Sequence, residues 1–181
     1  MIEKKQSPEF RTSGNLGKKG VIVTEQSSID ALTNRGYGTK QDDTFTLAFY
    51  EALYLADKGM LEVKDNKDQP VEFQQLLHCY EDQDQNAWVS YMVYRDLRSR
   101  GYVAREGFGK EIAFRVYERG SYGKDTASYL VLSTQEGKPL GIDALADALQ
   151  QCQSQKKELV LAVMNRRGEI VYYSVSQLTF K

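Results

Sequence analysis

Residues 112–131 contain the side chain that is best placed for chemistry, a tyrosine between a predicted strand and a polar loop. Ile112, Phe114 and Val116 alternate with their neighbours at the period of a half-buried strand. Tyr117 ends this strand on the face opposite the apolar set. A phenol at such a position can take part in proton transfer, although most strand tyrosines serve packing.

Histidine, the usual acid–base residue near neutral pH, occurs once, as His78. His78 falls in a predicted helix over residues 71–80, next to Cys79, and is interpreted as a structural or surface residue. Cys79 and Cys152 are far apart and have no CxxC spacing, which favours reduced thiols over a disulfide or a zinc site. The sequence implies no metal and no cofactor.

Composition places the chain among ordinary soluble globular proteins. It has 181 residues, of which 41% are hydrophobic and 27% are charged. No apolar run approaches the roughly 18–20 residues that span a bilayer, and the N-terminus lacks the apolar core of a signal peptide. We therefore expect a cytoplasmic or nuclear protein, with cytoplasmic favoured, and no membrane partner. The net charge of −1 argues against nucleic-acid binding through bulk charge but leaves room for a local basic patch.

Turn-rich polar segments indicate two small domains of mixed α/β type. The polar segment EDQDQN places the boundary near residue 85, so that the first domain covers residues 1–85. Its expected elements are a loose lead-in or short edge strand over 1–19, a strand at 21–23, a helix at 27–34, a helix with an apolar face from Phe45 to Ala56, a strand from Leu61 and a helix at 71–80.

The second domain, residues 86–181, alternates helical and strand patterns. The expected order is a helix around Val89–Leu97, a hairpin of 102–103 with 112–117, a strand at 129–132, a helix from Asp143, a strand at 159–163 and a closing strand at 170–175. This order predicts a mixed sheet flanked by two helices, and the fold class is α+β.

Several segments resemble the archaeal tRNA-intron splicing endonucleases. FRVYERG, TASYLV and QKKELVLAVMN are similar to blocks of that family's C-terminal domain, and YMVYRDLRSRGYVAREGFGKEIAFRVYERG is similar to its helix–hairpin lead-in. GYG…LAFYEALYLADKGMLEV is similar to the family's N-terminal domain. Because these segments match in order over most of the chain, the chain is identified as a member of the family. The resemblance implies a homo- or hetero-oligomer that recognises precursor tRNA folded as a bulge–helix–bulge.

The resemblance also implies a chemistry: metal-independent RNA cleavage by the substrate's own 2′-hydroxyl, leaving a 2′,3′-cyclic phosphate and a 5′-hydroxyl. The family's tyrosine, histidine and lysine supply the base, the acid and a stabilising cation. Tyr117 matches the tyrosine, and Tyr122 is an alternative that lacks the preceding apolar alternation. Lys157 matches the lysine, unless the alignment slips by one residue to Lys156. Thr126 stands at the histidine position, and threonine does not titrate near neutral pH.

Two further positions depart from the family. Gln150 replaces an arginine that often grips a flipped-out base. The turn at 165–169 is basic, whereas it is acidic in subunits that dock into a neighbour, so this chain is expected to receive such a loop rather than supply one. Basic residues expected to contact RNA are Lys124, Lys156, Lys157, Arg166 and Arg167.

The missing histidine leaves three functions open. The chain could be an impaired or structural subunit that supports a catalytic paralogue, which the loss of both the histidine and the arginine favours. It could be a fully catalytic subunit with a variant or engineered site, as the retained Tyr117 and Lys157 suggest. It could also be an RNA-binding module that does not cleave.

The closing strand, 170–175, predicts a contact between subunits. Tyr172, Tyr173 and Val175 give it more apolar and aromatic surface than a small domain needs on both faces of one strand. We therefore expect this strand to pair or pack across a dimer interface.

Overall fold

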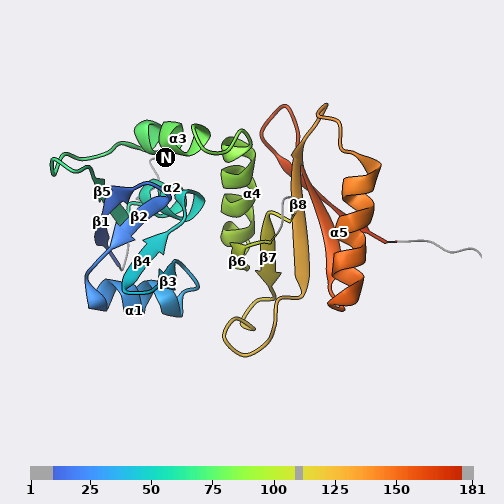
Figure 1. Ribbon diagram of the computed structural model, residues 1–181, viewed down its shortest axis with the longest axis horizontal. Helices are drawn as coiled ribbons and strands as arrows, with labels where there is room; N and C mark the ends of the chain where they lie inside the picture. Colours follow the sequence, from blue (N-terminus) through green and yellow to red (C-terminus); the bar gives the residue numbers. More distant parts are fainter. Residues whose placement is uncertain (1–9, 109–111, 177–181) are drawn as a thin grey trace, which may run out of the picture. The chain divides into compact units, whose positions relative to one another are not determined.

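The computed structural model describes residues 10–108 and 112–176, which form two compact units that divide between Ala87 and Trp88 (Figure 1). The described residues contain five helices and two five-stranded sheets, each of which mixes parallel and antiparallel pairs. This arrangement confirms the predicted α+β class. The boundary predicted near residue 85 falls in the connection between the third and fourth helices.

The first unit is built on a sheet of strand order β3-β4-β2-β1-β5. Helix α2 contacts strands β2 and β5 of this sheet as well as helix α3. The elements are β1 (Thr12–Gly17), β2 (Gly20–Val23), α1 (Gln26–Asn34), β3 (Thr39–Gln41), β4 (Thr44–Leu47), α2 (Phe49–Asp57), β5 (Leu61–Lys64) and α3 (Phe73–Glu81).

Two expectations for this unit are wrong. Strand β1 is not a loose lead-in or an edge strand, because it pairs with β2 on one side and with β5 on the other; residues 1–9 of the expected lead-in lie outside the described residues. Phe45 belongs to strand β4 rather than to the helix. The helix begins at Phe49 because the carboxylate of Glu51 accepts a hydrogen bond from the Ala48 amide at 2.9 Å, which caps its first turn.

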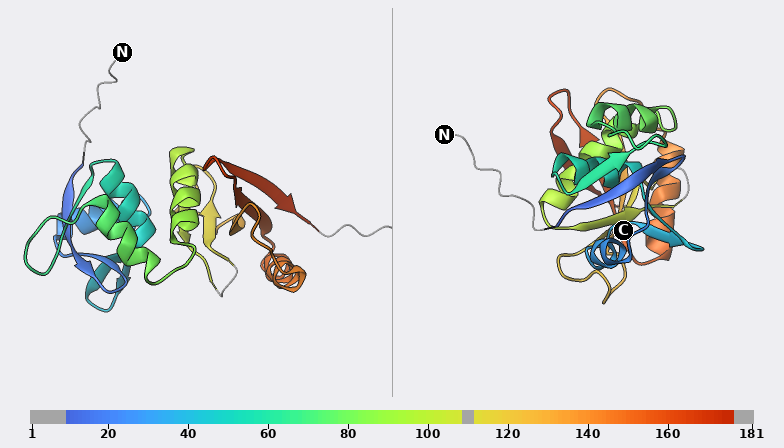
Figure 2. Two further views of the ribbon diagram at one scale, coloured as in Figure 1. Left: turned by 90° about the horizontal axis from the view of Figure 1, so that it is seen from above. Right: turned by 90° about the vertical axis from the view of Figure 1, so that its left-hand side faces the viewer.

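The second unit is a sheet of strand order β10-β9-β8-β7-β6 with helices on opposite faces (Figures 1 and 2). Its elements are α4 (Ala87–Ser99), β6 (Val103–Glu106), β7 (Phe114–Tyr117), β8 (Tyr129–Gln135), α5 (Ile142–Ser154), β9 (Glu158–Met164) and β10 (Ile170–Val175). The predicted hairpin, both helices and the closing strand are confirmed; residues 109–111 of the hairpin turn lie outside the described residues.

Strand alternation divides the apolar residues of this sheet between the two helices. Leu130 and Leu159 pack with Cys152 of α5 in one buried cluster. Val116 and Val160 face the other way, toward the side of α4. In the described part of the chain, no helix is both long and apolar enough to cross a bilayer.

Candidate active site

Three strands of the second unit meet at one sheet end, because β7 ends where β8 and β9 begin. Tyr129 of β8 pairs with Val116 of β7 and with Glu158 of β9. The next residues outward form a row across the three strands, consisting of Tyr117, Ser128 and Lys157. Two hydrogen bonds hold the row: the Ser128 amide donates to the Val116 carbonyl at 3.0 Å, and the Glu158 amide donates to the Ser128 carbonyl at 3.1 Å.

This row lies on the face of the sheet that α5 covers. Successive residues of a strand point to opposite faces, and Val116 points toward α4, so Tyr117 points to the α5 side. Tyr117 and Lys157 are two strand spacings apart, or about 10 Å between backbones. We call this the reactive end of the sheet, because it brings together two of the residues that the sequence predicts for catalysis.

The end of helix α5 fixes the position of Lys157. The Lys157 amide donates to the Cys152 carbonyl at 2.9 Å, and the Lys156 amide donates to the Gln153 carbonyl at 3.1 Å. Lys156 has a φ of 54°, the left-handed conformation that usually follows a helix in this pattern. The turn leaves Lys156 exposed, while Lys157 is half-buried and its ammonium donates to the Ala127 carbonyl.

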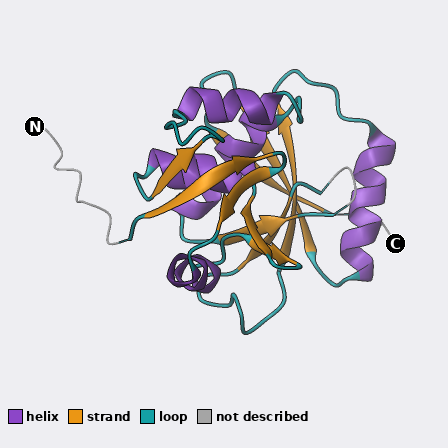
Figure 3. Cartoon of the chain, turned by 60° about the vertical axis from the view of Figure 1, so that its left-hand side comes forward, coloured by secondary structure: helices purple, strands orange, loops and turns teal. Residues whose placement is uncertain are grey.

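The loop of residues 118–128 links β7 to β8 without a helix or strand of its own (Figure 3). It folds back through turns in which the amides of Lys124 and Asp125 each donate to the Ser121 carbonyl at 2.9 Å. The ring of Tyr122 meets the ring of Tyr117 edge to face, with centroids 5.0 Å apart and planes at 88°. The loop therefore contacts Tyr117 at one end and, through the Ala127 carbonyl, Lys157 at the other.

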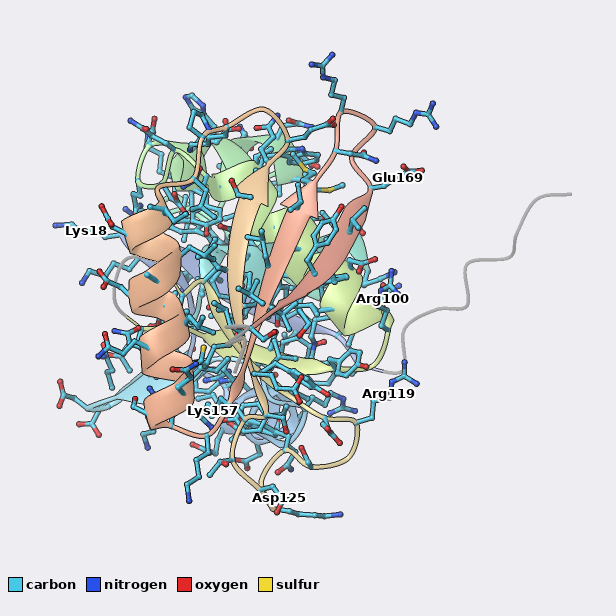
Figure 4. All side chains as sticks on the ribbon, turned by 90° about the vertical axis from the view of Figure 1, so that its right-hand side faces the viewer. Lys18, Arg100, Arg119, Asp125, Lys157 and Glu169 are labelled. Atoms are coloured by element: carbon cyan, nitrogen blue, oxygen red, sulfur yellow. The ribbon has the colours of Figure 1, made fainter. Side chains whose placement is uncertain are left out.

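Thr126 lies in this loop next to Ala127 and is exposed. Figure 4 shows the neighbouring Asp125 and Lys157 at the same end of the sheet. All three predicted catalytic positions therefore belong to the reactive end, but the hydroxyl of Thr126 cannot serve as an acid near neutral pH. His78 belongs to the other unit, where it is exposed on α3 with Nδ1 3.9 Å from a carboxylate oxygen of Glu81.

The basic residues expected to contact RNA fall into two groups. Lys124 and Lys156 are exposed at the reactive end. Arg166 and Arg167 are exposed in the turn between β9 and β10, at the opposite end of the sheet, where Figure 4 shows Glu169. Strand β9 separates the two groups by about 20 Å at 3.3 Å per residue. The expected residues therefore do not form one continuous patch.

The α4 side of the sheet contains a cavity of about 290 Å³ that the sequence analysis did not predict. Its lining residues are Leu97, Arg100, Tyr102, Val116, Tyr129, Val131, Val160 and Tyr172. Asp96 accepts hydrogen bonds from Arg100 Nε at 2.7 Å and from the Tyr172 hydroxyl at 2.8 Å. Burial, followed by the Asp96 carboxylate, raises the pKa of Tyr172. The four-residue spacing between Asp96, in α4, and Arg100, just after its end, is the one sequence signal for this network.

Comparisons with known proteins agree with this architecture. The sequence-family model of the tRNA intron endonuclease catalytic C-terminal domain matches residues 87–172, and that of the tRNA intron endonuclease N-terminal domain matches residues 12–77. The tRNA-splicing endonuclease of Pyrococcus horikoshii is 32% identical over 177 residues, which cover 97% of this chain and 99% of the relative.

Two more relatives are also named tRNA-splicing endonucleases. The tRNA-splicing endonuclease of Pyrococcus furiosus is 33% identical over 173 residues, covering 95% of this chain and 97% of the relative. That of Methanococcus vannielii is 30% identical over 171 residues, covering 94% and 97%. Both family domains are present in order, and the relatives match almost from end to end. The chain therefore belongs to the tRNA intron endonuclease family, as its sequence predicted.

Proposed function

We propose that this chain is a subunit of an RNA-cleaving assembly that binds precursor tRNA, folded as a bulge–helix–bulge, at the reactive end of the C-terminal sheet. The observation that carries the proposal is the row containing Tyr117 and Lys157. These residues are far apart in the sequence, yet strand pairing brings them about 10 Å apart on one face. The names of the relatives, tRNA-splicing endonucleases, supply the substrate class.

The proposed reaction is an internal transfer that needs a base, a cation and an acid. The phenolate of Tyr117 accepts the proton of the 2′-hydroxyl, and the 2′-oxygen forms a bond to phosphorus as the bond to the 5′-oxygen breaks. The ammonium of Lys157 stabilises the negative charge that develops on the phosphate oxygens. An ammonium has three N–H donors, and among the described residues the Ala127 carbonyl takes one of them. The products are a 2′,3′-cyclic phosphate and, after water protonates the departing 5′-oxygen, a 5′-hydroxyl.

The acid is the weak part of this site. The departing 5′-oxygen needs a proton, and Thr126 does not supply one near neutral pH. A missing general acid lowers a rate by about 10²- to 10⁴-fold. We therefore propose that this chain alone binds its RNA but cleaves it slowly, and that it works in an oligomer with a copy of itself or with a more active paralogue.

Restoring an imidazole tests this proposal directly. Thr126→His should raise single-turnover cleavage of a bulge–helix–bulge RNA by about 10²- to 10⁴-fold. The gain should disappear when Tyr117→Phe is added and fall strongly with Lys157→Ala. Thr134→His is the matched control, because Thr134 lies on β8 toward the opposite end of the sheet. It adds the same side chain away from the reactive end and should give no gain.

The alternative functions predict different results. Fast cleavage by the unmodified chain would favour a fully catalytic subunit with a variant site. No gain from Thr126→His, with RNA binding intact, would mean that Tyr117 and Lys157 are remnants and that the chain is a non-cleaving RNA-binding subunit. Loss of RNA binding in the unmodified chain would contradict the proposed function itself.

We also propose that strand β10 forms a contact between subunits. It is an edge of its sheet, and such edges pair readily with other chains. Val171 is 42% exposed and Tyr173 is 54% exposed, and both lie on the face of β10 opposite to that of Tyr172. A two-fold contact through β10 would bury these side chains against their copies.

A further inference from the structure

Tyr122 is a second tyrosine of the reactive end to which the proposed reaction assigns no role. Its ring contacts the ring of Tyr117 edge to face, with centroids 5.0 Å apart. This geometry directs the positive edge of one ring at the negative face of the other, which is a favoured arrangement of two aromatic rings. The contact is local in sequence, since only four residues separate the two tyrosines.

The backbone of the loop is arranged to make this contact. Gly120 and Gly123, on either side of Tyr122, have φ values of 78° and 81°, in the left-handed region that glycine adopts without strain. Ser121 ties the turn together, because its amide and its hydroxyl both donate to the Glu118 carbonyl, at 3.1 and 3.0 Å. The chain therefore reverses after β7 and brings Tyr122 back over the residue that ends the strand.

Tyr117 needs such a neighbour. It is the last residue of β7 and only half-buried, so the sheet fixes its backbone more firmly than its ring. A base must hold its oxygen within hydrogen-bonding reach of the proton that it removes, and a ring that samples several rotamers does so for only part of the time.

We propose that Tyr122 is a positioning residue for Tyr117, and that it acts through the edge of its ring rather than through its hydroxyl. The same loop ends at Ala127, whose carbonyl accepts a hydrogen bond from Lys157. One loop thus restrains both reactive side chains. The effect of Tyr122 on cleavage rests on the function proposed above, whereas its effect on the Tyr117 ring does not.

The first test separates the ring from the hydroxyl. Tyr122→Phe keeps the ring, whereas Tyr122→Leu removes it and leaves a side chain of moderate bulk. In the Thr126→His protein, Tyr122→Phe should cleave within about twofold of its parent. Tyr122→Leu should lower kcat by about two- to tenfold, the factor to which one aromatic pair corresponds, with KM within about twofold.

Tyr102→Leu is the matched control, because its ring contacts the Arg119 guanidinium 5.2 Å away rather than Tyr117; its kcat should stay within about twofold of the parent. Equal losses in Tyr122→Phe and Tyr122→Leu would overturn the proposal, because the hydroxyl would then be the active group. Unchanged kcat in Tyr122→Leu would overturn it as well.

The second test needs no cleavage. The unmodified protein is labelled with 3-fluorotyrosine, and the Tyr117 signal is assigned by its loss in Tyr117→Phe. Its ¹⁹F line should narrow in Tyr122→Leu, because the ring gains motion, and should stay unchanged in Tyr122→Phe. An unchanged width in Tyr122→Leu would overturn the positioning role. If Thr126→His fails to cleave, the proposed function fails while this measurement still decides the role of Tyr122.

Discussion

The two ends of the C-terminal sheet both present adjacent basic residues, but the two pairs differ in how other segments of the chain surround them. At the reactive end, the 118–128 loop and the end of α5 converge on Lys157, which is half-buried. At the opposite end, Arg166 and Arg167 are exposed in a turn that the side chain of Asn165 holds in place. There, Asn165 Oδ1 accepts hydrogen bonds from the Arg167 amide at 2.9 Å and from the Glu169 amide at 3.0 Å.

The difference between the two ends shows that separation along the sequence does not predict which residues lie close together in a sheet. Lys157 and Arg166 belong to the same strand–turn segment, yet the length of β9 separates them. Tyr117 and Lys157 come from separate segments with a strand and a helix between them, yet pairing through β8 places them in one row. A parallel pair such as β8–β9 forces this result, because both strands start at the same end of the sheet.

The largest expected difference separates two neighbouring lysines. In the Thr126→His protein, Lys157→Ala should lower single-turnover cleavage by about 10²- to 10³-fold, the cost of losing one group that stabilises transition-state charge. With the RNA fully bound, Lys156→Gly removes the same charge one residue away and should have little effect on the cleavage rate, because glycine adopts the left-handed conformation of Lys156 more readily. Equal losses in both variants would show that bulk charge, rather than position, matters at this end.

Assembly tests whether β10 is a subunit contact. The unmodified chain should be larger than a monomer at micromolar concentration in size-exclusion chromatography with light scattering. Tyr173→Glu should weaken this assembly by about a hundredfold or more, because two-fold pairing would bury two carboxylates in an apolar contact. Lys138→Glu, an exposed change in the connection between β8 and α5, is the control. A strictly monomeric parent would contradict the proposed contact.

Salt dependence compares the two ends as RNA-binding surfaces. Replacing Lys156 and Lys157 with alanine should flatten the plot of log affinity against log salt by up to about two units, since each phosphate contact contributes nearly one. Replacing Arg166 and Arg167 removes the same charge and should flatten it less. An unchanged slope in the lysine variant would place the RNA-binding surface elsewhere, and a larger change in the arginine variant would reverse the comparison.

The smallest expected effect is a change in the pH dependence of stability, which arises from Tyr172 on the α4 side of the sheet. Tyr172 has a raised pKa, so above about pH 10 an unfolded tyrosine loses its proton while the folded one keeps it. The folded state then binds more protons, and stability falls as pH rises. At pH 8, Tyr172→Phe should have a free energy of unfolding about 1 kcal/mol lower than the parent, because it loses the hydrogen bond to Asp96. Above pH 10, its free energy of unfolding should fall less steeply with pH than that of the parent.

Urea unfolding followed by the fluorescence of Trp88 measures this effect, because Trp88 is the one tryptophan of the sequence and lies in α4. Tyr173→Phe is the control, since Tyr173 is exposed on the alternate face of β10. Parallel stability curves for the parent and Tyr172→Phe above pH 10 would contradict a raised pKa of Tyr172.

Local sequence patterns determined most of the C-terminal unit. Strand β10 has its predicted bounds, Ile170–Val175, and helix α5 begins one residue before the predicted start at Asp143. The patterns failed where two periods overlap. Phe45 is four residues before Phe49, which mimics one face of a helix, but Thr44–Leu47 alternates and pairs with β2. Strand pairing outweighed the weaker local preference there.

The candidate site was only partly contained in the sequence. The resemblance to a family supplied Tyr117, Thr126 and Lys157, but sequence positions alone do not say how far apart these side chains lie in space. Only the register of β7, β8 and β9 places Tyr117 and Lys157 in one row, and only the left-handed turn after α5 distinguishes Lys157 from Lys156. The contact between Tyr122 and Tyr117 likewise depends on how the loop folds back. The sequence determines the types of the side chains. Which side chains meet depends on strand pairing and chain reversals, because these bring together residues that are distant along the chain.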